Sequence, residues 1–184
     1  MGSIDSAMGA TMLKAAEDIL RDEGYAALTS RRVSEYAGVK QRLVYYYFAT
    51  MDDLIIESFR RLAVRELERL RTSISSNHPL HDIWDMCMNT ADSRLVAEFM
   101  ALANRNEGLR QEVIKFIEES RDIQISAIKK ALASGGSKDL KPVAIAFLGS
   151  SVALALNREA ALGVTMGHQT VKRLIKQFCD GLEG

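Results

Sequence analysis

Only two prolines, Pro79 and Pro142, occur in the 184 residues of this chain. Elsewhere apolar residues such as Ile55, Phe59 and Leu62 recur at steps of three to five, which is typical of helices with one buried face. Alanine, leucine, arginine and glutamate are plentiful, and these residues favour helix over strand. The sequence therefore predicts an all-α protein of about nine helices.

Capping residues and glycines predict where the helices begin and end. Thr29 is placed to cap the second helix, and Gly38 separates that helix from the third. Thr50 and Asp53 predict a capping box at the start of the fourth helix. The clearest predicted loop is the Ser-Gly-Gly-Ser segment 134–137. The predicted helices are 11–23, 29–37, 39–48, 50–75, 80–91, 93–104, 108–133, 141–162 and 167–182.

The overall charge gives no indication of a partner, because 24 basic and 24 acidic residues cancel. The segment 29–47 is different, since its four basic residues and one acidic residue give it a local charge of +3. Its two predicted short helices, joined by a tight turn at Gly38, are typical of a helix-turn-helix. In that motif the second helix enters the major groove of DNA.

The third predicted helix carries the side chains expected to read DNA. Lys40 and Gln41 lie in its first turn, and Arg42 follows; amide and cationic groups there can bond adenine or guanine edges. The helix period places Tyr46 near bases or sugars, and Tyr45 and Tyr47 near phosphates. The alternative is that the tyrosines are half-buried core residues with solvated hydroxyls.

The segment from about Leu13 to Leu54 resembles the N-terminal domain of the TetR (tetracycline-repressor) family. That resemblance implies a three-helix DNA-binding domain over residues 1–54 and a helical ligand-binding and dimerisation domain over 55–184. It also implies phosphate contacts at the start of the second helix, from Thr29, Ser30 and Arg31. The matching residues are Ala15-Ala16, Gly24-Tyr25, Leu28-Thr29, Arg32-Val33, Ala37-Gly38-Val39, Tyr45, Tyr47-Phe48 and Leu54.

Two positions depart from the family pattern. Lys40 stands where a small polar residue is usual, and Met51 stands where a lysine is usual. We therefore expect an altered operator sequence and an altered backbone clamp. The resemblance implies a transcriptional repressor that a small molecule releases from a palindromic operator.

The last two predicted helices are the expected dimer interface. Helix 141–162 is rich in small residues that permit close helix approach, and helix 167–182 carries one apolar face. A two-fold dimer would place two recognition helices about one DNA turn (~34 Å) apart. The alternative is that these helices only close the core of a monomer.

The effector site is predicted among methionine and aromatic side chains, which suit apolar ligands. The same residues are equally what a filled core needs. Asn104 is a candidate for holding a polar group of the ligand. The predicted ligand-binding residues are Trp84, Met88, Phe99, Met100, Asn104 and Phe116.

Two other classes of protein are weighed against a DNA-binding regulator. The chain has no nucleophile elbow, P-loop, dinucleotide fingerprint or metalloprotease motif, so we expect no enzyme, no catalytic residue and no cofactor. His78 and His81 are three residues apart beside Pro79 with no nearby cysteine, so we expect no metal site. A helical ligand-binding or adaptor protein without DNA binding is the remaining alternative.

A cytoplasmic location is expected. Two cysteines, Cys87 and Cys179, are too few for a disulfide scaffold, and the first residues lack the pattern of a signal peptide. The most apolar stretch, 143–156, falls short of the ~20 residues that span a bilayer, and we expect a buried helix there and no membrane partner.

Overall fold

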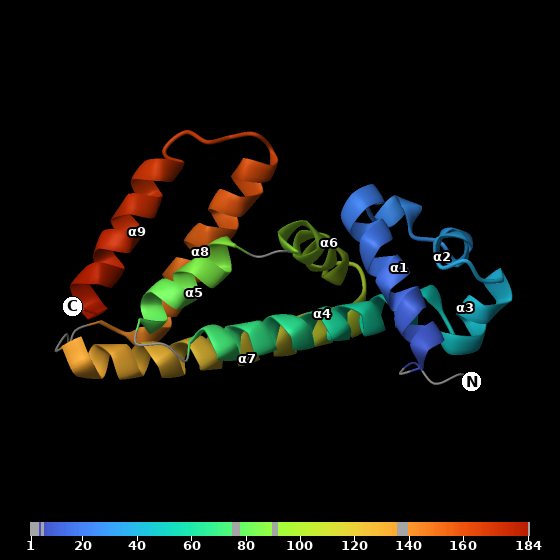
Figure 1. Cartoon of the computed structure of the whole chain (residues 1–184), viewed down its shortest axis with the longest axis horizontal. Helices are drawn as coiled ribbons and strands as arrows, with labels where there is room; N and C mark the ends of the chain where they lie inside the picture. The colour runs from blue at the N-terminus through green and yellow to red at the C-terminus, as the bar shows by residue number, and fades with distance from the viewer. Residues whose placement is uncertain (1–3, 5, 75–77, 90–91, 136–139, 184) are drawn as a thin grey trace. The chain divides into compact units, whose positions relative to one another are not determined.

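The computed structural model describes residues 4, 6–74, 78–89, 92–135 and 140–183. In these residues all regular structure is helical, which confirms the predicted all-α class (Figure 1). The elements are α1 (Ala7–Glu23), the 3-10 helix η1 (Tyr25–Ala27), α2 (Ser30–Tyr36), α3 (Gln41–Tyr47), α4 (Met51–Ser73), α5 (Pro79–Met88), α6 (Ser93–Ala103), α7 (Glu107–Gly135), α8 (Pro142–Ala161) and α9 (His168–Glu183).

The helices form two compact units. The first unit comprises residues 1–64 and 92–115, and the second comprises 65–91 and 116–184. Because α4 and α7 each supply residues to both units, no linker marks the division. The predicted boundary after residue 54 stays a prediction. That boundary separates the three N-terminal helices from the rest of the chain. The first compact unit also includes the early turns of α4, where Phe59 packs edge-on against Phe99 of α6.

The first unit is built around α1. Met12, Ala16, Ile19 and Leu20 are fully buried, so this helix presents an apolar stripe to α2 and α6. The helix begins four residues earlier than predicted, because the Ser6 hydroxyl accepts a hydrogen bond from the backbone N–H of Gly9 at 3.1 Å and caps the first turn.

The start of α4 follows the predicted capping box. The Asp53 carboxylate accepts a hydrogen bond from the Thr50 backbone N–H at 2.9 Å, and the Thr50 hydroxyl accepts one from the Asp53 N–H at 3.0 Å. This reciprocal pair fixes the residue at which α4 begins after the connection from α3.

The second unit packs α5 against α8 and α9 over the later turns of α7. In Figure 1, α8 and α9 run in opposite directions and are joined by residues 162–167. The predicted loop 134–137 lies partly in α7, which continues to Gly135, and partly outside the described residues.

The expectation that residues 143–156 form a buried helix was wrong for the isolated chain. Of α8 only Ala146, Ala153 and Leu156 are buried. Ile145 and Val152 are partly buried against the apolar clusters of the second unit, whereas Val143, Phe147, Leu148 and Leu154 stay exposed. By length and composition α8 is apolar enough to cross a membrane, although only 17% of its most apolar window is buried.

Candidate nucleic-acid interface and apolar cavity

The turn between α2 and α3 depends on Gly38. Its φ of 67° lies in the left-handed region, which a residue with a Cβ rarely adopts. The backbone N–H of Val39 donates to Ser34 O at 2.9 Å and closes the turn. Val33, Val44 and Phe48 are buried beneath it, so the two short helices share one core and hold a fixed angle.

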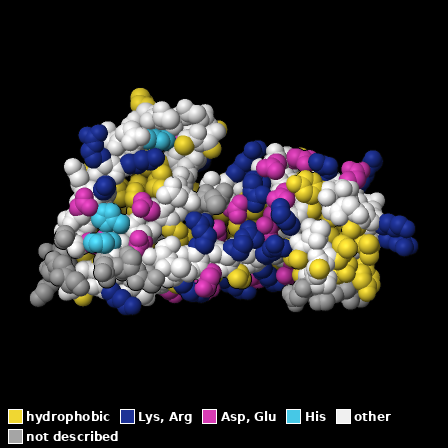
Figure 2. Space-filling model, in the orientation of Figure 1, with side chains coloured by type: hydrophobic (Ala, Val, Ile, Leu, Met, Phe, Trp, Pro, Cys, Tyr) yellow, Lys and Arg dark blue, Asp and Glu magenta, His cyan; other side chains and the backbone are white. Residues whose placement is uncertain are grey.

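The outer surface of α3 is polar and aromatic. Lys40, Gln41 and Arg42 are exposed, and Tyr45 and Tyr46 each keep 52% of their surface exposed. Tyr47 is half-buried, and its ring stands edge-on to Tyr46 with centroids 5.3 Å apart. Figure 2 shows basic side chains beside side chains of the hydrophobic class, which includes tyrosine, at this end of the first unit. Two of the three tyrosines are therefore available to a partner.

Ser30 organises part of this surface from below. It is buried at the first residue of α2, and its hydroxyl accepts hydrogen bonds from Gln41 Nε2 at 2.8 Å and from the Tyr45 hydroxyl at 3.1 Å. The amide of Gln41 keeps its carbonyl oxygen and one N–H for other partners. Ser30 thus links α2 to α3 and fixes two of the predicted reading side chains.

Thr29 has a structural role at the same point. Its hydroxyl accepts a hydrogen bond from the Arg32 backbone N–H at 3.1 Å and caps α2. Met51 opens α4 and is half-buried, so no cation stands at the position where the family usually has lysine.

The basic side chains of the segment fall into two groups. Arg31 pairs with Glu35 at 2.8 Å, and Arg32 forms two-point hydrogen bonds with Glu23. By contrast, Lys40 and Arg42 make no ion pair within the described residues. The positive charge available to a partner therefore lies mainly at the start of α3, on Arg42 and on Lys40 just before the helix. The local charge of +3 for residues 29–47 did not indicate that Arg32 is neutralised, because its partner Glu23 lies outside that segment.

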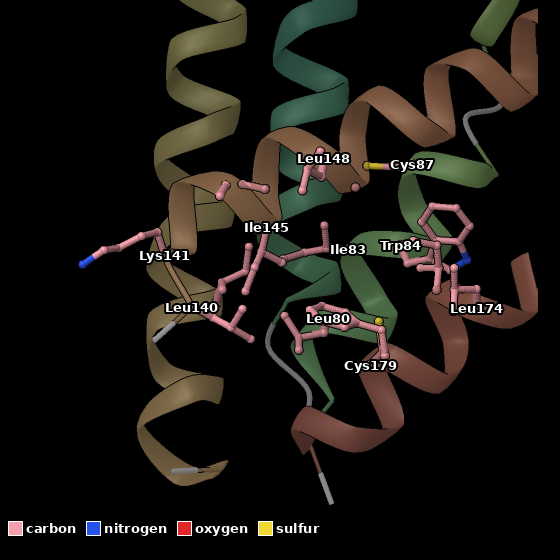
Figure 3. A pocket seen from close by; sticks show the side chains of 16 residues that line it. Leu80, Ile83, Trp84, Cys87, Leu140, Lys141, Ile145, Leu148, Leu174 and Cys179 are labelled. Atoms are coloured by element: carbon pink, nitrogen blue, oxygen red, sulfur yellow. The ribbon is translucent and has the colours of Figure 1, made fainter. Parts of the chain in front are cut away.

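The second unit contains an apolar cavity of about 400 Å³. Trp84 and Ile83 of α5, Ile145 of α8 and Leu174 of α9 border it (Figure 3). The Lys141 side chain extends away from the space, so its ammonium group does not enter it. The lining residues are Leu80, Ile83, Trp84, Cys87, Ile128, Leu140, Lys141, Ala144, Ile145, Ala146, Leu148, Gly149, Leu174, Ile175, Phe178 and Cys179.

The two thiols in the cavity wall carry no charge at neutral pH. Burial raises the pKa of Cys87, and burial together with nearby Glu183 and Asp180 raises the pKa of Cys179 to about 11. No acidic residue is among the lining side chains. The cavity therefore suits an uncharged, largely apolar molecule.

Of the six predicted ligand-binding residues, Trp84 is the one that lines this cavity. Met88 packs against the cluster that contains Trp84, Ala153 and Leu156. Phe99 is fully buried against Phe59 in the first unit. The roles of the remaining predicted residues stay predictions: Met100 and Phe116 are half-buried on α6 and α7, and Asn104 is exposed after α6, where its side chain donates to Met100 O.

Sequence reasoning missed most of the cavity wall, which comes from α8 and α9. Those helices were assigned to a dimer interface alone. The alternation of small and large apolar residues on these helices could have indicated a cavity, since small residues leave space between helices as well as allowing close contact.

Large apolar side chains are also exposed on α8 and α9. We call the following six residues the α8–α9 face: Val143, Phe147, Leu148, Leu154, Leu174 and Phe178. Exposed apolar patches of this kind mark interaction surfaces in soluble proteins. Leu148, Leu174 and Phe178 belong to both this face and the cavity wall.

Residues 12–57 match the family model described as bacterial regulatory proteins, tetR family. Among curated proteins, the HTH-type transcriptional regulator CymR of Pseudomonas putida is 25% identical over 117 residues. The matched segment is 60% of this chain and 58% of CymR, so the likeness spans less than two thirds of that protein.

Solved structures share the fold over almost the whole chain. A TetR transcription regulator from Haloarcula marismortui has a TM-score of 0.79 at 20% identity, covering 95% of this chain and 97% of its own. A transcriptional regulator from Saccharomonospora viridis, solved in complex with choline, has a TM-score of 0.82 at 13% identity. The match covers 93% of this chain and 94% of that protein's chain.

Proposed function

We propose that this chain, whose residues 12–57 match the tetR family model and whose fold is shared by a TetR regulator of known structure, is a repressor acting as a homodimer on a near-palindromic DNA operator. A largely apolar small molecule releases it from that site. The protein has no catalytic role in this proposal, and it acts in the cytoplasm.

The exposed surface of α3 is the observation that carries the DNA-binding proposal. Lys40, Gln41 and Arg42 stand at the start of the helix, where a recognition helix reaches base edges. Lys40 and Arg42 supply positive charge that Glu23 and Glu35 do not offset. Thr29 and Arg31 at the start of α2, and Tyr45, Tyr46 and Tyr47, complete the proposed contact surface. Buried Ser30 is proposed to support that surface through its hydrogen bonds to Gln41 and Tyr45.

The proposal of an apolar effector rests on the cavity of the second unit. Its size lies within the range of small-molecule pockets, and its wall offers aromatic and aliphatic surface with almost no hydrogen-bonding groups. Trp84 supplies a large flat contact area. A hydrophobic ligand would gain about 25 cal/mol for each Å² of apolar surface that it buries there.

A second copy of this chain is the proposed partner of the α8–α9 face. The face carries six large apolar side chains that stay exposed, although the guanidinium of Arg121 lies over the Phe147 ring at 5.0 Å. Small residues on α8, among them Ala144 and Ser151, allow a partner helix to approach closely. Two helices from each subunit would then form a four-helix interface.

The deciding experiment is selection of bound duplexes from a random-sequence pool by the purified full chain at about 150 mM salt, where weak ionic binding fades. We expect a palindrome whose half-site centres are about ten base pairs apart. If several rounds of selection recover no motif, the repressor proposal is wrong.

An R31A/K40A/R42A triple variant separates the repressor from the adaptor alternative. Its affinity for the selected operator should fall to the level of random DNA, whereas K129A, which removes an exposed lysine from α7, should bind like the parent chain. Equal operator binding by the parent chain and the triple variant would show that α3 does not read the operator, whereas the adaptor alternative predicts no sequence-specific binding by either protein.

A further inference from the structure

The start of α5 and the end of α9 bring together two histidines and a glutamate. His81 Nδ1 lies 2.6 Å from Glu183 Oε2, and His78 Nδ1 lies 3.8 Å from the same oxygen. One ligand atom from each of the three residues lies within 4.8 Å of the others. Figure 2 shows histidine side chains beside acidic ones over this part of the second unit.

The glutamate is held in place on its other side. Its Oε1 accepts a hydrogen bond from the backbone N–H of Leu80 at 2.5 Å, and its side chain is only 3% exposed. One oxygen of Glu183 is therefore committed to the first turn of α5, and the other is left facing the two imidazoles. A buried carboxylate fixed in this way is preorganised to bind a cation.

Asp180 completes the arrangement from the adjacent turn of α9. His81 Nε2 lies 2.9 Å from Asp180 Oδ1. Without an ion, both ring nitrogens of His81 can donate to carboxylates. When a metal displaces the Nδ1 proton, Nε2–H keeps its hydrogen bond to Asp180 and the Nδ1 lone pair binds the ion beside Glu183. A carboxylate that orients a histidine in this way is the usual outer partner of a metal-binding imidazole.

The spacing is close to what a tetrahedral ion requires. Bonds of about 2.0–2.1 Å at a tetrahedral angle place neighbouring ligand atoms about 3.3 Å apart. The distance from His81 Nδ1 to Glu183 Oε2, now 2.6 Å, must therefore increase by about 0.7 Å. The distance from His78 Nδ1 to the same oxygen, now 3.8 Å, must decrease by about 0.5 Å. Changes of this size need only small side-chain rotations, because His78 is 64% exposed and His81 is partly exposed.

We propose that His78, His81 and Glu183 bind one first-row divalent transition-metal ion, zinc foremost, with solvent as the fourth ligand. Asp180 is a positioning residue that orients His81. Two imidazoles and one carboxylate favour zinc over magnesium or calcium, which take oxygen ligands. The ion ties α5 to α9, next to Leu80 and Cys179 of the cavity wall. The expectation of no metal site from the sequence failed to anticipate partners about a hundred residues away.

The test is a zinc titration of the full chain, without a histidine tag, against a chromogenic chelator at pH 7.5. We expect one equivalent of zinc per chain, and an affinity at least about ten-fold lower in H78Q and in H81Q. H168Q is the matched control, because His168 pairs with Glu159 at the other end of α9 and should not affect zinc binding. Magnesium should not compete.

Two further measurements keep the test independent of folding defects and of DNA binding. H78Q replaces an exposed side chain, so its helical circular dichroism should match the parent, and D180N should weaken zinc binding while leaving one equivalent bound. Cobalt should bind with the visible absorption of a four-coordinate site and lose it on adding zinc. The proposal would be overturned if H78Q and H81Q bound zinc as tightly as the parent chain. It would also be overturned if H168Q lost as much zinc affinity as those two variants.

Discussion

Ser30 shows how one small side chain can set the chemistry of a larger surface. The residue itself is buried, yet its hydroxyl receives the Gln41 amide and the Tyr45 hydroxyl. An oxygen that accepts two hydrogen bonds restricts the rotamers of both donors. The entropy of ordering those side chains is then already lost before a partner binds.

Replacing Ser30 by alanine should therefore reduce sequence discrimination more than overall affinity for DNA. Without its anchor, Gln41 samples several rotamers, so preference for the base pair that it reads should fall by up to about ten-fold. Competition binding with single-base operator variants measures this, and the salt dependence of binding should not change. An unchanged ranking of operator variants in S30A would contradict the role given to Ser30.

Lys40 is expected to act through its charge. A cation beside the DNA backbone releases condensed counterions, and each such contact contributes about 0.9 to the slope of log K against log salt. K40A should lower the affinity and reduce that slope by about one, as measured by fluorescence anisotropy between 50 and 200 mM salt. K129A serves as the control, and a slope equal to that of the parent would place Lys40 outside the contact surface.

Sequence reasoning located the surface residues well and their internal partners poorly. The helix period correctly separated buried Val44 and Phe48 from exposed Tyr45 and Tyr46, because burial follows from spacing along one element. The pairing of Arg32 with Glu23 and of Gln41 with Ser30 depends on how elements meet. That information is not contained in local spacing.

At the scale of single elements, α1 carries a charge cluster that joins it to α6. Asp18 is nearly buried and accepts hydrogen bonds from Lys14 at 2.5 Å and Arg21 at 2.7 Å. Arg21 also donates to Asp92, which precedes α6, at 2.8 Å. Burial alone would raise the pKa of Asp18, but the hydrogen bonds from Lys14 and Arg21 outweigh it and hold that pKa below its usual value.

The lowered pKa of Asp18 determines how its contribution to the stability of the fold depends on pH. Because the folded-state pKa of Asp18 lies below the unfolded value, its charged form stabilises the fold fully above about pH 4, and that stability is lost as the pH falls through the folded-state pKa. D18N should lower the free energy of unfolding in urea by about 1–2 kcal/mol at pH 7 and by less near pH 3, where part of the Asp18 population is protonated. D22N, on the exposed side of α1, is the control; an equal loss at both pH values would contradict the assignment.

Element boundaries followed the sequence where a cap or a glycine defined them. The start of α1, which Ser6 caps, was missed, and the third helix also differs, since residues 39–48 were predicted and α3 is Gln41–Tyr47. Lys40 has an extended backbone that completes the turn, so the first predicted residues belong to the connection. Helical periodicity does not separate a terminal turn from the chain that enters it.

At the scale of the whole molecule, the exposed apolar surface of α8 is what the single chain does not explain. The small residues of this helix suggested an interface, and its high hydropathy suggested burial. Both expectations can hold in a dimer, because a partner would supply the covering helices that the chain lacks. The sequence could not show which face would be left open, since that depends on where α5 and α9 pack.

Introducing a charge on this face should separate the proposed subunits. L154E places a carboxylate on the α8–α9 face without touching the cavity wall. The parent chain should sediment as a dimer at micromolar concentration, and L154E should sediment as a folded monomer with weakened operator binding. V64E charges an equally exposed apolar site on α4 and should remain dimeric. A dimeric L154E would place the interface elsewhere.

Leu148, Leu174 and Phe178 have a consequence that reaches beyond the shape of the cavity. Because the same side chains border the cavity and the open face, whatever covers the face alters the free energy of filling the cavity. Thermodynamic linkage makes that effect reciprocal, so a ligand in the cavity must change the subunit dissociation constant by the same factor. The cellular abundance of this chain would then set its sensitivity to the ligand: a cell with few copies and a cell with many would respond to different doses of the same compound.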